Sequence, residues 1–485
     1  KIGKRKEEKN QRGSMEDEEA KQRRKLEEET ERVCPSHHPP PPPDELFDIS
    51  TTVDPSYVIS LIRKLLPIDS GSEECDQSNE EKDRVSSSME EAWEDHGCVL
   101  WDLAASRTHA ELMVENLILE VLHANLMVSK STRIREICLG IIGNLACHEG
   151  LLKHIESTAG LVNILVGQLF LDDTQCLSEV CRILTTGLYG AGCTFWAECL
   201  QHDDILRRIL WIAENTLNPH LIEKSVGLLL GIIEGQQEVG QLLIPPLMTL
   251  GLTSLFINLL SIEMSKLPTE RIPERYPVLE IILRAIEALS ASDSHSKEIC
   301  SSKQLFQLVC DLMKLQDKAE VATSCVTAGV LVANMLSETV EFVPEVSQGF
   351  SFLEGLFSTL PFASDDLEAR KALWNVIARL LARVNESEIN TFCLTQYISV
   401  LLSSSDNIED DLLDIQLEDS NEEFQNSFRA RTIAIQKMES ILNSWNVRKE
   451  NLQEESMNGD CSVNKADVKR LSDCCQRYIK SIEGS

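Results

Sequence analysis

The sequence predicts an all-α fold in which helices repeat along the chain as a superhelical solenoid of about seven units. The main observation is a helical pattern that recurs every 42–47 residues once insertions are removed: residues 136–146 align with 179–189 and then with 224–234. No stretch alternates apolar and polar residues as a half-buried strand would. Aromatic residues at 5% and 22 glycines also argue against a sheet-rich fold. A period of this length is typical of HEAT and armadillo repeats.

Polar segments flank and interrupt this repeating body. The start of the chain alternates acidic and basic residues and then runs through five prolines, so we expect it to be disordered. A short apolar pattern between Asp54 and Pro67 predicts one amphipathic helix before the repeats. The expected order is a disordered tail 1–48, a short helix 49–68, an acidic linker 69–88, a solenoid 89–445 with an acidic insertion 403–423, a linker 446–465 and a C-terminal helix 466–485.

One unit, Arg133–Cys147, shows the expected packing in detail. Its apolar residues fall on a single helical stripe, which predicts one buried face. Gly140 and Gly143 each cost about 1 kcal/mol of helix propensity, so we expect them where a neighbouring helix approaches closely. The residues that precede later units are good helix N-caps, namely Asp173, Asn218 and the pair Asp365-Asp366.

The segment from Val239 to Ile262 has no charge and is long enough to span a bilayer. Pro245 and Pro246 are expected to break it and to leave residues 247–260 as one continuous helix. A buried solenoid helix fits that length better, so no membrane partner is predicted.

The charge balance is strongly acidic, with 46 Lys+Arg against 78 Asp+Glu and a net charge of -32. Such a surface repels phosphate backbones and attracts basic protein segments. We therefore expect a protein partner that presents a basic or extended segment and do not expect nucleic acid. No prediction of oligomeric state follows.

No catalytic or metal-binding arrangement is evident in the sequence. The 16 cysteines are scattered without a CxxC pair, which indicates a reducing compartment, the cytosol or nucleus. His148 and His154 are six residues apart, whereas the zinc-protease helix needs four to place both rings on one face. The sequence thus predicts no enzyme activity, no cofactor and no metal.

Two kinds of transport signal predict a protein found in nucleus and cytoplasm. Basic clusters in the tail resemble nuclear-localisation signals, with a solvated charged tail as the alternative. Leucine and isoleucine residues in the acidic insertion have the spacing of an export signal, in a segment expected to be exposed, with a docked amphipathic turn as the alternative. The basic residues are Lys4, Arg5, Lys6, Arg23, Arg24 and Lys25, and the apolar ones are Ile408, Leu412, Ile415 and Leu417.

Two stretches together resemble a known family. Leu-Trp-Asp-Leu-Ala at 100–104 is followed by Arg-Ile-Arg-Glu-Ile-Cys-Leu-Gly-Ile-Ile-Gly-Asn-Leu-Ala-Cys at 133–147. This pattern resembles the hallmark of the serum amyloid A-like protein 1 family over about residues 89–200. The resemblance implies an armadillo-like superhelix without enzyme activity, in a largely nuclear protein linked to cell proliferation.

The main hypothesis is a non-enzymatic scaffold that binds a partner segment on the concave face of the solenoid. The candidate contact residues are the polar positions of the best-defined units, Arg135, Glu136, Asn144, Glu179 and Arg182, with simple solvation as the alternative. A different class of function, RNA binding, would use a basic strip formed by Arg133, Arg135, Arg207 and Arg208.

Overall fold

The computed structural model describes residues 53–67, 79–269, 271–292, 294–346, 349–414, 425–453 and 464–483. The chain divides into two compact units, residues 1–54 and 55–485. Every described helix belongs to the second unit, and the described part of the chain contains α- and 3-10 helices without a strand. The prediction of an all-α fold is therefore confirmed.

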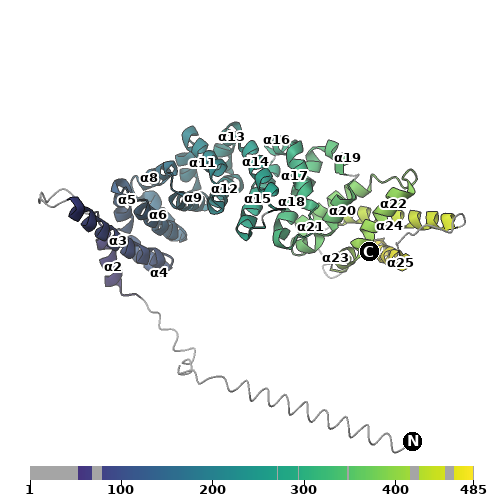
Figure 1. Ribbon diagram of the computed structural model, residues 1–485, viewed down its shortest axis with the longest axis horizontal. Coiled ribbons are helices and arrows are strands. Elements are labelled where there is room, and N and C mark those ends of the chain that lie inside the picture. Colours follow the sequence, from purple (N-terminus) through teal and green to yellow (C-terminus); the bar gives the residue numbers. More distant parts are fainter. Residues whose placement is uncertain are drawn as a thin grey trace, which may run out of the picture. The chain divides into compact units, whose positions relative to one another are not determined.

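The second unit is built around a row of long helices, each of which packs on the next (Figure 1). The contacts run from α3 to α6, α9, α12, α15, α18, α21 and α24 in that order. We call this row the ladder. Its members are α3 Asn79–Ala104, α6 Thr132–Ala146, α9 Thr174–Tyr189, α12 Pro219–Glu234, α15 Tyr276–Ser290, α18 Ala322–Glu338, α21 Leu367–Leu381 and α24 Gln425–Gln453.

A second row of helices precedes the ladder helices in sequence and covers their apolar faces. It comprises α5 Ile118–Val128, α8 Leu161–Gly167 with the 3-10 turn η2 Gln168–Phe170, α11 Asp203–Asn215, α14 Leu252–Lys266, α17 Lys303–Met313, α20 Phe350–Phe357 and α22 Thr391–Ser403. These helices also contact one another in order, for example α11 with α14 and α14 with α17.

Shorter helices complete each repeat. They are α4 Arg107–Glu115, α7 Glu149–Ser157, α10 Cys193–Leu200, α13 Gln237–Thr249, α16 Ser296–Cys300 and α19 Val343–Val346. Each repeat from α4–α5–α6 to α19–α20–α21 thus has three helices. Three helices per unit distinguish armadillo repeats from the two-helix HEAT type. The remaining elements are α2 Pro55–Lys64, α23 Ser405–Asp414, α25 Lys465–Glu483, η3 Pro273–Arg275, η4 Ala319–Val321, η5 Val340–Phe342 and η6 Leu360–Ala363.

Side-chain caps fix the starts of several ladder helices. The Asp173 carboxylate accepts the amide hydrogen of Cys176, and the Asn218 side chain accepts that of Leu221. Asp366 does the same for α21. These contacts confirm the predicted caps, because each satisfies a backbone donor that has no partner inside its helix.

Two predicted boundaries and one predicted break are wrong. Helix α3 begins at Asn79, inside the expected acidic linker, and α24 continues to Gln453, inside the expected linker 446–465. Pro245 and Pro246 lie within α13. The break falls instead after α13, at Gly251, whose φ of 100° is left-handed, and the helices on either side are bent by 74°.

One described helix, Ala319–Glu338, is long and apolar enough to cross a membrane, and the bent pair α13 and α14 also meets that test if counted as one span. Helix α18 forms most of the first segment and packs between α15 and α21, with Leu331, Val332 and Met335 fully buried. Its apolar composition is explained by this position in the core.

The described part of the acidic insertion, residues 403–414, is partly buried. Residues 405–414 form α23, in which Ile408 is 0% and Leu412 is 3% exposed, so the expected exposure of these two side chains is wrong. Asp411 is buried beside them and accepts a 2.9 Å hydrogen bond from Trp374 Nε1. Ile415 and Leu417 lie outside the described residues, as do Lys4, Arg5, Lys6, Arg23, Arg24 and Lys25.

Candidate functional site

The hallmark glycines of α6 are contact points with large neighbouring side chains. A Cβ atom on Gly140 would lie 2.1 Å from the Trp101 indole of α3, and one on Gly143 would lie 2.2 Å from Arg182 Nη2 of α9. Asn144 Nδ2 donates to the Trp101 carbonyl oxygen at 2.9 Å. The predicted close packing at both glycines is confirmed, and it joins three ladder helices.

Arg182 carries this contact into the next repeat. Its guanidinium donates to Gly140 O at 3.2 Å and to Asn144 Oδ1 at 3.3 Å, and it forms an ion pair with Glu179. The structure therefore brings together Asn144, Glu179 and Arg182, three of the five candidate contact residues. The contacts of Arg182 with Asn144 and Gly140 join α9 to α6, and its ion pair with Glu179 lies within α9.

The other two candidates lie elsewhere on α6. Arg135 donates twice to Ser129 O, at 2.9 and 2.8 Å, and so satisfies a carbonyl just after the end of α5. Glu136 accepts a 2.7 Å hydrogen bond from Arg133. Both side chains are half-buried and are used within the chain.

The basic strip required for the RNA-binding alternative is divided between the two rows of helices. Arg133 and Arg135 belong to α6 of the ladder, whereas Arg207 and Arg208 belong to α11 of the second row. Arg208 donates to the carbonyl oxygens of Leu169 and Leu171, at 2.7 and 2.6 Å. Three of the four guanidinium groups thus already have partners in the fold, which weakens this alternative.

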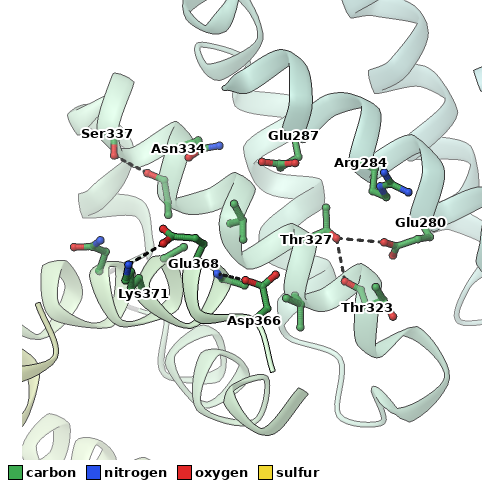
Figure 2. A pocket seen from close by; sticks show the side chains of 16 residues that line it. Glu280, Arg284, Glu287, Thr323, Thr327, Asn334, Ser337, Asp366, Glu368 and Lys371 are labelled. Carbon is green, nitrogen blue, oxygen red and sulfur yellow. Dashed lines mark hydrogen bonds and ion pairs between the residues drawn. The ribbon is translucent and has the colours of Figure 1, made fainter. Parts of the chain in front are cut away.

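A groove with a volume of about 820 Å³ opens on the ladder further along the chain (Figure 2). Helix α18 forms its floor, and α15 and α21 form its two walls. The floor contains small or β-branched side chains, Thr323, Val326, Thr327, Val330, Ala333, Asn334 and Ser337. The sequence reasoning missed this groove, although residues 321–337 carry no charge on either face, which was the available signal.

Most of the charged groups in the walls form hydrogen bonds or ion pairs with other residues of the chain. On α15, Glu280 accepts from Ser324 at 2.9 Å and from Thr327 at 3.4 Å. On α21, Glu368 pairs with Lys371 at 2.7 Å. Arg284 pairs with Glu234 of α12 at 3.5 Å. These contacts hold the walls in place and leave few side chains available to a ligand.

Glu287 differs from the other carboxylates in the walls. It is half-buried on α15, and among the described residues no side chain or amide group hydrogen-bonds to its carboxylate. Burial raises the pKa of Glu287, and the negative charges of Glu234 and Asp366 raise this pKa further, while Arg284 lowers it. The groove therefore contains one partly desolvated carboxylate in a locally negative environment.

The described residues show no metal centre around this groove. Over the described ranges, no group of three His, Cys, Asp or Glu side chains could hold a metal ion. The groove has small side chains on its floor and charged side chains on its walls.

The three-helix units, the ladder and its groove define a helical-repeat protein of the armadillo type. Over 177 residues, 36% of this chain and 37% of the relative, the chain is 29% identical to Protein SAAL1 of Homo sapiens. It is 26% identical over 191 residues to Protein saal1 of Danio rerio, 39% of each chain. The resemblance inferred from the sequence is confirmed, over less than two fifths of these relatives' own length. No protein-family model matches the chain.

Solved structures with similar folds have low sequence identity. A designed armadillo repeat protein in complex with a (KR)4 peptide is 15% identical, with a TM-score of 0.43, over 57% of this chain and 99% of that one. An engineered protein is 17% identical, with a TM-score of 0.45, over 87% of this chain and 98% of that one. The assignment to the armadillo type rests on the helix packing of this chain.

Proposed function

We propose that this protein is a non-enzymatic interaction scaffold that binds a segment of a partner protein in the groove formed by α15, α18 and α21. The observation that carries the proposal is the groove itself, whose floor is uncharged although the whole chain has a net charge of -32. An uncharged floor between charged walls accommodates the backbone and small side chains of an extended segment.

The charge of the groove favours a basic partner. Its walls and their edges contain four acidic residues, Glu280, Glu287, Asp366 and Glu368, against the two basic residues Arg284 and Lys371. Complementary charge increases the rate of encounter and selects among partners.

The test is affinity capture from cell lysate with three forms of the full chain. Ala333→Trp fills the groove floor, and Ser265→Trp adds the same side chain at an exposed position of α14 in the second row. We expect proteins that bind the wild type and Ser265→Trp but not Ala333→Trp, with and without ribonuclease treatment. Equal capture by all three forms would refute the groove as the site, and loss of capture after ribonuclease treatment would favour the RNA-binding alternative.

The proposal includes a location in both nucleus and cytoplasm and a link to cell proliferation. Its support is the basic clusters at 4–6 and 23–25 and the resemblance to Protein SAAL1. Replacing both basic clusters with alanine in a fluorescent fusion should shift the protein towards the cytoplasm. An unchanged distribution would remove the clusters from the proposal.

A further inference from the structure

Four carboxylates border the groove, and three of them already have hydrogen-bond donors. Glu280 has two hydroxyl donors, Glu368 has the Lys371 ammonium group, and Asp366 accepts the Ala369 amide hydrogen at 3.0 Å. Among the described residues, no side chain or backbone amide donates a hydrogen bond to the carboxylate of Glu287. Figure 2 shows it on the α15 side of the groove.

An ionised carboxylate that is half-buried without a donor is held at an energetic cost. Arg284 reduces this cost only in part, because its side chain is 50% exposed and its guanidinium pairs with Glu234. Glu234 and Asp366 add negative charge from the neighbouring helices α12 and α21. A cation that arrives from outside would supply the missing donor and relieve the repulsion together.

We propose that Glu287 is the specificity-determining residue of the groove and receives the side chain of a lysine or arginine from an extended partner segment. This inference rests on the proposed function and identifies which partner segments the groove accepts. The neighbouring floor, formed by Val326, Val330 and Ala333, takes the small apolar residues of that segment.

The dimensions of the ladder set the length of the segment. Axes of packed helices lie about 8–10 Å apart, so the distance from α15 across α18 to α21 is about 16–20 Å. An extended chain rises about 3.3 Å per residue, so five or six residues cross the groove. Side chains alternate along such a segment, so a basic residue at every second position would reach Glu287 from more than one register.

The test uses three fluorescein-labelled octapeptides, (Lys-Val)4, (Ser-Val)4 and (Glu-Val)4, with the full chain in fluorescence anisotropy. Glu287→Gln removes the charge without changing the shape, and Glu368→Gln removes the charge of a carboxylate that has a partner in the chain. We expect (Lys-Val)4 to bind more tightly than the other two peptides. Glu287→Gln should weaken it about tenfold and Glu368→Gln by less than about twofold.

The pH dependence of binding adds a readout that a purely structural role would not change. Glu234 of α12, Arg284 of α15 and Asp366 of α21 are the charged groups that act on Glu287. Because the pKa of Glu287 is raised above the usual 4.5 of a glutamate, wild-type affinity for (Lys-Val)4 should fall more steeply than the affinity of Glu287→Gln as the pH is lowered from neutral towards 4.5.

The other outcomes separate this inference from the proposed function. If Ala333→Trp abolishes binding of (Lys-Val)4 and Glu287→Gln does not weaken it, the groove binds segments but Glu287 does not select them. An equal loss of affinity for (Lys-Val)4 in Glu287→Gln and Glu368→Gln would show general charge attraction and overturn the inference. If (Lys-Val)4 does not bind, or binds Ala333→Trp as well as the wild type, the inference is overturned and the proposed function loses its support from basic segments.

Discussion

Helices α6 and α18 are equivalent members of the ladder, and both have a glycine at a closed contact, since a Cβ on Gly329 of α18 would lie 2.4 Å from Leu373 Cδ2; α18 differs because it also places small side chains on an open face. In α6, Gly140 and Gly143 face the neighbouring helices and are covered by the Trp101 indole and the Arg182 guanidinium. In α18, the small side chains at Val330 and Ala333 face solvent and form the floor of a groove. A small residue at a helix–helix contact lets the two helices pack closely, whereas a small residue on the open face leaves a groove in the surface. The same row of helices therefore contains closed contacts and, at α18, an open groove.

The largest effect on stability is expected at Asp411, whose carboxylate makes a closed contact between buried charged groups. Its carboxylate lies 3.4 Å from Arg370 Nε and 3.8 Å from Arg431 Nε, and all three side chains are almost fully buried. Asp411→Asn leaves two buried guanidinium groups facing a neutral amide. We expect a loss of about 3–5 kcal/mol in the free energy of unfolding, measured by urea titration.

Asp410 provides the matched control for this prediction, because it is the exposed neighbour on the same helix. Asp410→Asn should change the free energy of unfolding by less than about 0.5 kcal/mol. A similar small change in Asp411→Asn would mean that α23 does not pack on α21 and α24, and the exposed segment predicted from the sequence would become the better description.

The next effect tests the closed contact of α6 directly. Gly140→Ala places a methyl group where the Trp101 ring lies, so we expect a loss of about 1–3 kcal/mol. Gly227 of α12 is the control, because the nearest atom to a Cβ there is Ile281 Cδ1 at 3.6 Å. Gly227→Ala should be neutral or stabilise by up to about 1 kcal/mol through helix propensity. Thermal melts of both variants that moved in the same direction would contradict the comparison.

The sequence predicted what depends on local pattern. The repeat period, the caps at Asp173 and Asn218 and the close packing at Gly140 follow from spacing and from the conformational preferences of single residues. The prediction placed the break between α13 and α14 at the two prolines, whereas the chain turns at Gly251, which has a left-handed backbone.

What the sequence could not predict depends on contacts between distant residues. The burial of α23 depends on Arg370 and Arg431, which lie on two other helices, and an acidic segment read alone appears solvated. Likewise, the polar groups of Asn144 and Arg182 looked available because their partners lie 43 and 42 residues earlier, at Trp101 and Gly140. The groove on α18 could not be predicted because it depends on how far the side chains of α15 and α21 extend beside it.

A pH-dependent effect is expected at Lys318, just before the floor helix of the groove. Its ammonium group is buried and donates to Gly355 O and Ser358 Oγ, both at 2.6 Å, and burial lowers the pKa of Lys318 to about 8. The unfolded chain then binds more protons than the folded one between pH 8 and 10.5, so stability due to this group rises with pH.

Lys318→Met removes this titration. The free energy of unfolding of the wild type should increase relative to Lys318→Met by about 2–3 kcal/mol between pH 8 and 10.5. Parallel pH profiles for the two proteins would show that the amine is as well solvated in the folded state as in the unfolded one.

The smallest effect on stability is expected at Ala333, where the surface of α18 is open. Ala333 is half-buried and lines the groove, so the side chain introduced by Ala333→Trp can extend into the open space. We expect the free energy of unfolding to change by less than about 0.5 kcal/mol, measured by urea titration beside Gly140→Ala. A loss of 2 kcal/mol or more, on the scale of overpacking, would mean that α15 and α21 close over α18. Helices α6 and α18 would then both use small residues only at closed contacts, and the groove of α18 would not be open to a partner segment.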